Sequence, residues 1–493
     1  MTDLQADIDA AAGGGTVRVP PGVHETGPLR LRSGVTLELA PGAVLRGPAA
    51  IDGYGDDTHL LVADGAENVA VTGRGTIDGR GTAFMTDEPI GLDIPGHSAR
   101  QGEDYPLRGA DAPRAPRERP DGLVRFADCA GVAVEGVTLT GSPAWTLHCR
   151  ACDDVTVSGV TIDNDPRIPN SDGVVPDMCR DVRVSDCRIR TGDDAIPVKA
   201  TGQGGVRDCE NVAVTNCVLA SRSGAVFVGG RAAGDIRHVV VSDCVVRESN
   251  RGLAVRAYGP GAVEDVRVSN VTVETRLFAG NWWGQAEPVY VAAHPHRPGV
   301  DCGGVRDLTL SGVTATAEQG AFLYAGDGAT IEGVTLDDVS LRVVGGEHTD
   351  SVGGNFDVRW ITDDDAPEGR LPDIYAHDVP GVYARGVTDL ALRNVAVEWG
   401  DDPPAFFSSA VACEAFAGLA VDGLVGRGAT PDDPVVDLRD GREIRIRDST
   451  ATAGAGRFLS LADTAGERLF AGNDLGACED AGPVGAFAVT DAG

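Results

Sequence analysis

Short stretches of alternating apolar and polar residues recur along the middle of the chain at a nearly constant spacing. The pattern is V-x-V-x-x-(V or C), and its copies begin at Val132, Val155, Val182, Val212, Val239 and Val266, with a related copy at Leu308. The first six starts are separated by 23, 27, 30, 27 and 27 residues. Alternation over a few positions predicts a short strand with one buried face. A fixed period of this length predicts stacked structural units instead of separate domains.

The segments between these strands are rich in Gly, Asn and Asp and show no amphipathic helix. Such connections are typical of a parallel β-helix, whereas a β-sandwich needs turns about every 8–12 residues. We therefore predict an all-β solenoid of the parallel β-helix type. Cys187, Cys217 and Cys244 occupy the same position of three consecutive repeats, which predicts a ladder of buried thiols inside it.

The two ends of the chain differ from the repeats. The segment LQADIDAAAGGG, which starts at Leu4, has the apolar spacing of a short helix ending at glycines, so we predict a helix that caps the core. Beyond about Gly345 the repeat weakens, with an acidic, Pro-rich excursion at 363–373, and later returns. We interpret the chain, 1–493, as one domain of three successive parts: a cap with the first strands (1–25), regular coils (26–345) and less regular coils (346–493).

The net charge of the chain limits the kinds of molecule that it is expected to bind. The chain has 74 Asp plus Glu against 42 Lys plus Arg, a formal net charge of −32, which disfavours nucleic acid and anionic membranes as partners. Only one of the basic residues, Lys199, is a lysine. Acid excess with almost no lysine resembles halophilic proteins of salt-loaded cytoplasms, where a Debye length of about 3 Å at molar salt screens the self-repulsion.

Targeting, disulfide and metal signals are weak. The N-terminal stretch MTDLQADIDAAAGGGTV lacks the basic and apolar regions of a secretory signal, and no run reaches the roughly 18 apolar residues of a membrane helix. We therefore expect a cytoplasmic protein. Its 11 cysteines, an odd number, argue against a disulfide framework. Cys149 and Cys152 form a C-x-x-C without a second pair at zinc spacing, and His294 and His296 are equally weak, so we predict no metal site.

Polar residues fall at equivalent positions of consecutive repeats. Six residues beyond the strand motifs that end at Cys187, Cys217 and Cys244 stand, in order, Asp193 followed by Asp194, Ser223, and Asn250 followed by Arg251. The preceding repeat carries NSDG, and its Asp172 joins this set if one loop is about six residues longer. Equivalent positions of adjacent coils lie about 4.8 Å apart, so we expect a column of these side chains on one outer face.

Three crowded carboxylates have a definite chemical use. Asp172, Asp193 and Asp194 cannot all ionise readily at neutral pH, so at least one pKa should rise and leave a proton donor beside a proton acceptor. Glycoside hydrolysis needs this pair of functions. The alternative is that these aspartates only form Asx-turns at coil corners, and their clustering at one position favours the chemical interpretation.

The stretch from GSPAWTLHC through NSDG to TGDDAIPVK resembles the central region of glycoside hydrolase family 28, the polygalacturonase-like enzymes. The resemblance extends from GGGTVRVPPGVHETGPL through GRGTIDGRG to NWWGQAEPVYV and covers most of the chain to about residue 400. It implies a right-handed parallel β-helix and inverting hydrolysis without a cofactor. It also implies that Asp193 is the general acid and that Asp172 and Asp194 position and activate water, with the wide carboxyl separation of about 6.5–9.5 Å that accompanies inversion.

The chain departs from this family at two sugar-contacting positions. Ser223 in RSG stands where the family often has the histidine of Gly-His-Gly, and Ala254, Val255 and Arg256 stand where polygalacturonases have Arg-Ile-Lys. One of the two cations that grip the sugar carboxylate in the family is therefore missing. Arg251 or Arg256 can replace it, because a guanidinium binds a carboxylate in a bidentate way.

Further candidates for substrate binding lie near these motifs. Lys199 follows the acid pair, where a compact ammonium can lower the pKa of a base carboxylate or contact an acidic sugar; the alternative is a chance survivor on the surface. Trp282 and Trp283 form either a sugar-stacking wall or a hydrophobic plug between coils. Asn170 and Glu287 complete the predicted substrate-binding set.

We predict a glycoside hydrolase that acts on pectin-derived or other uronic-acid-containing oligosaccharides or polysaccharides. Two alternatives remain open. A β-helix polysaccharide lyase would remove a proton with a basic residue, often with Ca²⁺, but no basic column is obvious in the sequence. A non-catalytic glycan-binding solenoid would leave the three aspartates without a role.

Overall fold

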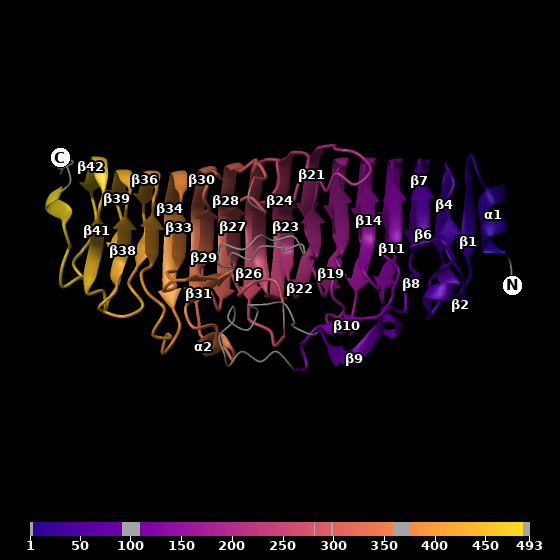
Figure 1. The fold of residues 1–493 in the computed structure, drawn as a ribbon, viewed down its shortest axis with the longest axis horizontal. Helices are drawn as coiled ribbons and strands as arrows, with labels where there is room; N and C mark the ends of the chain where they lie inside the picture. Colours follow the sequence, from indigo (N-terminus) through magenta and orange to yellow (C-terminus); the bar gives the residue numbers. More distant parts are fainter. Residues whose placement is uncertain (1–2, 91–108, 281, 297–298, 358–373, 487–493) are drawn as a thin grey trace.

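A computed structural model describes residues 3–90, 109–280, 282–296, 299–357 and 374–486. The chain winds into a long stack of parallel strands, with α1 (Leu4–Ala10) at the N-terminal end and the last coils at the other (Figure 1). The predicted all-β parallel β-helix and its N-terminal helix are therefore confirmed. The acidic excursion predicted at 363–373 lies outside the described residues.

The repeats lie in one sheet of 24 strands. Its strands are β1 (Gly15–Val19), β2 (Gly22–Glu25), β4 (Val35–Leu39), β5 (Ala43–Arg46), β7 (Glu67–Gly73), β8 (Thr76–Asp78), β12 (Ala130–Glu135), β13 (Thr138–Thr140), β15 (Asp153–Ser158), β16 (Thr161–Asp163), β18 (Arg180–Ser185), β19 (Arg188–Thr191), β21 (Cys209–Thr215), β22 (Val218–Ser221), β24 (Ile236–Ser249), β26 (Val263–Thr275), β28 (Val305–Ala317), β30 (Ile331–Val343), β34 (Val387–Trp399), β36 (Ala417–Asp422), β37 (Val425–Gly426), β39 (Arg442–Arg447), β40 (Thr450–Ala451) and β42 (Ala465–Ala471). The repeated apolar residues pair in register, Val132 with Val155 and Val155 with Val182, so one periodic pattern builds one continuous core.

Two shorter sheets form the face that carries the site. One contains β3 (Leu29–Arg30), β6 (His59–Asp64), β11 (Gly122–Ala127), β14 (Trp145–Arg150) and β17 (Val174–Asp177). The other contains β20 (Ile196–Val198), β23 (Gly224–Gly230), β25 (Arg251–Ala257), β27 (Val289–Ala293), β29 (Ala321–Ala325), β33 (Val382–Arg385), β35 (Val411–Glu414), β38 (Pro434–Arg439) and β41 (Arg457–Ala462). A bridge between Asp177 and Lys199 links the two sheets, so the face continues from coil to coil.

Two short antiparallel strand pairs and a short helix lie outside the three parallel sheets. Two antiparallel pairs are formed by β9 (Met85–Pro89) with β10 (Arg114–Pro116) and by β31 (Asn355–Asp357) with β32 (Ile374–Ala376). The second short helix is α2 (Thr349–Val352).

Each repeat bends at a residue with left-handed backbone conformation. Asp186, Asn216, Asp243 and Asn270 have φ values of 57°, 54°, 55° and 53°, and each precedes the Cys or Val that ends its motif. Asn and Asp tolerate this conformation better than other non-glycine residues. Asn216 Nδ2 donates to Asp186 Oδ1 at 2.6 Å, and Asn270 Nδ2 donates to Asp243 Oδ1 at 2.6 Å. Neighbouring bends are thus tied together.

Nine of the 11 cysteines are buried, and Cys302 and Cys478 are partly exposed. The amide of Val218 donates to the carbonyl of Cys187, and that of Val245 to Cys217, which places Cys187, Cys217 and Cys244 at one position of successive coils. All three are buried, and the predicted ladder is confirmed. All 11 cysteines fall within the described ranges and are free thiols.

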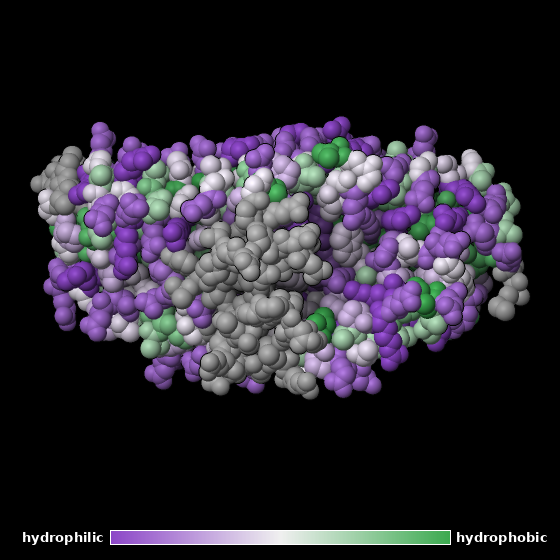
Figure 2. Space-filling view, viewed as in Figure 1, coloured by the Kyte–Doolittle hydropathy of each residue, from purple (hydrophilic) through white to green (hydrophobic). Residues whose placement is uncertain are grey.

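The surface is largely hydrophilic in the view of Figure 2. Among the described residues, no helix is long and apolar enough to cross a membrane.

Candidate active site

Polar side chains stand where the strands of the site face begin. The amide of Gly173 donates to the carbonyl of Asp194 at 2.9 Å, which brings Asp172 and Asp194 to equivalent positions of adjacent coils. The amide of Gly224 donates to Asp194 Oδ1 at 2.8 Å, and Gly224 pairs in turn with Arg251. One column therefore runs from Asp172 through Asp194 to Arg251.

A second column starts one residue earlier. The amide of Ala195 donates to Gly224 and that of Arg251 donates to Ser223, so Asp193, Ser223 and Asn250 occupy equivalent positions. The single predicted column is thus two adjacent columns. The loop before β17 places Asp172, and not a residue next to it, at the position equivalent to that of Asp194.

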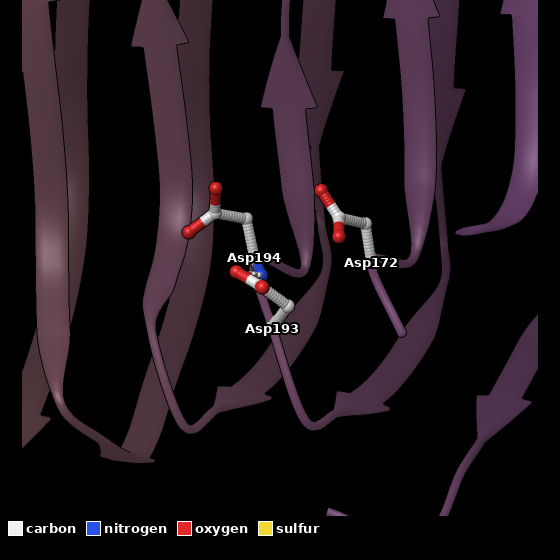
Figure 3. Close-up of side chains that lie close together, drawn as sticks. All are labelled: Asp172, Asp193 and Asp194. Atoms are coloured by element: carbon white, nitrogen blue, oxygen red, sulfur yellow. Dashed lines mark hydrogen bonds between the residues drawn. The ribbon is translucent and has the colours of Figure 1, made fainter. Parts of the chain in front are cut away.

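The three carboxyls converge. Figure 3 shows Asp172 on one coil and Asp193 and Asp194 on the next. One oxygen from each lies within 4.8 Å of the others. The carboxyl separation of about 6.5–9.5 Å that the family resemblance implies stays a prediction, because the value of 4.8 Å bounds the nearest oxygens and not the distance between the carboxyl groups. All three side chains are nearly buried, with exposed fractions of 2%, 8% and 7%.

Burial and nearby charges raise the pKa values of two of these groups, Asp193 and Asp172. Burial, followed by the charges of Asp172 and Asp194, holds the pKa of Asp193 well above its usual range. Burial also raises the pKa of Asp172, although the attraction of Lys199 opposes that effect. These shifts favour the protonated form of Asp193 and, opposed by Lys199, of Asp172.

Lys199 lies against the carboxyls. Its Nζ donates to Asp172 Oδ2 at 2.8 Å and stands 4.3 Å from the ring centroid of Trp145. Burial lowers the pKa of this ammonium, but the attraction of Asp172, Asp194 and Asp193 outweighs burial and raises it. Lys199 is therefore a partner of the acid cluster and not a surface survivor.

Asn170 contacts Asp193. The side chain of Asn170 is held in turn by Arg119, a residue that the sequence analysis did not single out. Asn170 Nδ2 donates to Asp193 Oδ2 at 3.4 Å, and Arg119 Nη2 donates to Asn170 Oδ1 at 2.9 Å. Arg119 precedes β11, far from the NSDG motif in sequence, and no local pattern marks it.

The sequence placed Glu287 among the substrate-binding residues, and the structure corrects this. Glu287 is 1% exposed and accepts from Arg251 Nε at 3.1 Å and Nη2 at 3.2 Å. The guanidinium also stacks on Tyr290, 3.7 Å from its ring centroid. Glu287 therefore supports Arg251 from behind, while Arg251 itself lines the cavity.

The two tryptophans have different roles. Trp282 is 3% exposed and donates from Nε1 to the carbonyl of Asp111 at 3.0 Å, so its predicted contact with sugar is wrong and the plug interpretation holds for it. Trp283 lines the cavity. Asn250 fixes this loop, since it donates to the carbonyl of Gly284 and accepts from the amide of Ala286.

These groups border an open cavity of about 520 Å³. The predicted site residues that line it are Asn170, Asp172, Asp193, Asp194, Lys199, Ser223, Arg251, Arg256 and Trp283. The guanidinium of Arg256 lies 4.1 Å from the ring centroid of Tyr258. Neighbouring strands bring Phe227, which lines the cavity, beside Ala254, and the guanidinium of Arg256 lies 5.8 Å from the ring centroid of Phe227.

Within the described ranges, the three aspartates are also the one group of His, Cys, Asp or Glu side chains close enough to hold a metal ion. The ammonium of Lys199 already supplies a positive charge there, bonded to Asp172. The geometry fits a carboxylate cluster balanced by an internal cation.

A parallel β-helix that presents a raised-pKa carboxyl beside two further carboxylates has the fold and the acid–base groups of a glycosidase. Residues 15–357 match the family model described as Glycosyl hydrolases family 28, and the chain belongs to this family. The family resemblance seen in the sequence is thereby confirmed.

Three known proteins that are similar to this chain have sequence identities of 27%, 23% and 18%. A probable polygalacturonase of Vitis vinifera is 27% identical over 335 residues, which cover 62% of this chain and 63% of that protein, less than two thirds of its length. An endo-polygalacturonase of Pectobacterium carotovorum subsp. carotovorum is 23% identical over 361 residues, 69% of this chain and 83% of that protein. The solved polygalacturonase from Erwinia carotovora ssp. carotovora has the same fold, with a TM-score of 0.53 at 18% identity, covering 82% of this chain and 92% of that one.

Proposed function

We propose that this protein hydrolyses glycosidic bonds in pectin-derived or other uronic-acid-containing oligosaccharides, with inversion at the anomeric carbon. The observation that carries this proposal is the buried cluster of Asp172, Asp193 and Asp194 at the cavity wall. Asp193 donates its proton to the leaving oxygen. A water held by Asp172 and Asp194 attacks the anomeric carbon and passes its proton to one of them. That carboxyl then releases its proton to solvent, and Asp193 takes one up from solvent.

The surroundings of the cluster support an acidic substrate. The chain carries a net charge of −32, yet the cavity is lined by Lys199, Arg231, Arg251 and Arg256. A second cavity of about 380 Å³ shares Trp145, Asn170 and Gln203 with the first and adds Arg125 and Arg150. Guanidinium groups match the planar, bidentate geometry of carboxylates. A cationic groove on an anionic protein favours a sugar that carries carboxylates.

Inversion is supported by Asp172 and Asp194, two carboxylates that can hold the same water molecule. Retaining enzymes use one carboxylate as a nucleophile, with carboxyls about 5–5.5 Å apart. However, Asp172 already bonds Lys199 through Oδ2, and Asp194 bonds the amide of Gly224 through Oδ1. Each of these two carboxylates keeps its other oxygen for a shared water. A retaining mechanism would need only one of them, as the nucleophile.

We expect saturated products with inverted anomeric configuration from a panel of oligogalacturonates at high salt. Proton NMR at early times, before mutarotation, measures this outcome directly. Retained configuration would show that one carboxylate is a nucleophile. An unsaturated uronate product would establish the lyase, and binding without product would leave a glycan-binding solenoid.

We also propose that the protein is adapted to high salt, on the basis of its net charge of −32 and its single lysine. Lowering the salt from about 1 M to about 0.01 M lengthens the Debye length from about 3 Å to about 30 Å, so repulsion between surface carboxylates should lower Tm. Thermal unfolding across a KCl series, with sucrose of equal osmolality as the control, measures this effect. The proposal is contradicted if KCl and sucrose raise Tm equally. It is also contradicted if neither of them changes Tm.

A further inference from the structure

Arg119 connects three chain segments around the proton donor. It lies between β10 and β11, and its Nη1 donates to the carbonyls of Pro143 at 2.7 Å and Pro169 at 2.8 Å. Its Nη2 donates to Asn170 Oδ1 at 2.9 Å. The guanidinium therefore fixes both the backbone before Asn170 and the side chain of Asn170.

The direction of the Asn170 amide follows from these donors. A guanidinium has only N–H donors, so it must face the carbonyl end of an amide. The NH₂ end of Asn170 then points the other way, where its Nδ2 lies 3.4 Å from Asp193 Oδ2. The backbone of Asn170 is left-handed, with φ of 57°, which an Asn tolerates. The amide thus has one orientation, set by Arg119.

We propose that Arg119 is a positioning residue for the proton donor Asp193, acting through the side chain of Asn170. This inference rests on the proposed role of Asp193. The arrangement holds Asp193 Oδ2 toward the cavity and donates one hydrogen bond to it, so that the carboxyl keeps its direction through proton loss and regain.

The charges that face Asp193 define the expected pH dependence. Asp172 and Asp194 disfavour its ionised form, whereas Lys199 favours it. The amide NH₂ of Asn170 and the positive charge of Arg119 behind it act in the same direction as Lys199. Loss of Arg119 therefore raises the pKa of Asp193, and the basic limb of the pH profile of kcat/KM moves to higher pH.

The test compares Arg119→Gln and Arg119→Lys in the full chain. Misplacement of a catalytic group by about 1 Å can lower the rate by about 10²-fold, so we expect Arg119→Gln to lose kcat by about this factor with KM little changed. Arg119→Lys keeps the charge and a donor, and should recover part of kcat and keep the basic limb near its wild-type pH. Arg188→Gln, an exposed site on β19, is the matched control for loss of one guanidinium.

A double-mutant cycle tests whether Arg119 acts through Asn170. Asn170→Gly keeps the left-handed backbone accessible while it removes the amide. If Arg119 acts through Asn170, adding Arg119→Gln to Asn170→Gly should produce little further loss of kcat. Additive losses, or an unmoved basic limb in a folded Arg119→Gln protein, overturn the inference. A wild-type protein without hydrolytic activity would instead contradict the proposed function itself.

Discussion

Asp193→Asn should lower kcat by about 10²- to 10⁴-fold, the usual contribution of a general acid. Asparagine keeps the shape of the side chain but cannot give a proton to the leaving oxygen. Asp193 is 8% exposed, and its pKa is raised by burial first and by Asp172 and Asp194 next, so its carboxyl retains the proton that the proposed general acid donates. Initial rates with a saturating oligogalacturonate measure the effect.

The same substitution should leave the folded state at least as stable. A carboxyl whose folded pKa lies above its unfolded value binds more protons in the folded state, so its contribution falls as pH rises from the unfolded toward the folded pKa. Asp193→Asn removes this neutral-pH penalty, and its Tm should equal or exceed that of the wild type. Asp338→Asn, at an exposed left-handed position of β30, is the control with the same chemical change.

Activity of Asp193→Asn within a factor of two of wild type would remove Asp193 from the mechanism. A fall in Tm together with lost activity would instead assign it a structural role. Rescue at lower pH is not expected, because the amide does not titrate in the working range.

The sequence predicted the coil architecture because one apolar period specifies it. Valines at matched positions stack in register, and the Asp or Asn before each terminal Cys or Val adopts the left-handed bend. The same period allowed Asp172, Asp193 and Asp194 to be placed together, since strand spacing converts sequence positions into distances.

Other parts of the site depend on contacts that the apolar repeat pattern does not predict. Trp282 and Trp283 are adjacent in sequence, yet one donates to the carbonyl of Asp111 and the other lines the cavity. Arg119 reaches Asn170 across 51 residues of chain. These contacts are decided by how loops pack over the coils, which depends on side-chain shapes and not on alternation.

The one lysine in the chain provides the second test with a large expected effect. Lys199 Nζ bonds Asp172 Oδ2 at 2.8 Å, and their side chains are 16% and 3% exposed, so the pair is largely buried. Lys199→Met removes the attraction that opposes the raised pKa of Asp172, and this pKa should rise further. A larger fraction of Asp172 would then hold a proton and could not take one from water.

We therefore expect Lys199→Met to lose most of the contribution of the base, about 10²- to 10⁴-fold in kcat/KM at neutral pH. The acidic limb of its pH profile should move to higher pH, with part of the activity recovered there. Arg188→Met removes an exposed cation and should change neither quantity.

Lys199→Arg separates charge from shape. The guanidinium keeps the positive charge, so the acidic limb should stay near its wild-type pH. It is larger than an ammonium, however, and the space is bounded by the ring of Trp145 at 4.3 Å and by Asp172, so overpacking of about 1–3 kcal/mol should displace Asp172 and lower kcat. Wild-type kinetics in this variant would show that either cation suffices and that Lys199 escaped replacement by chance. A lowered kcat with an unmoved acidic limb would show that the site requires the compact ammonium that the rest of the chain lacks.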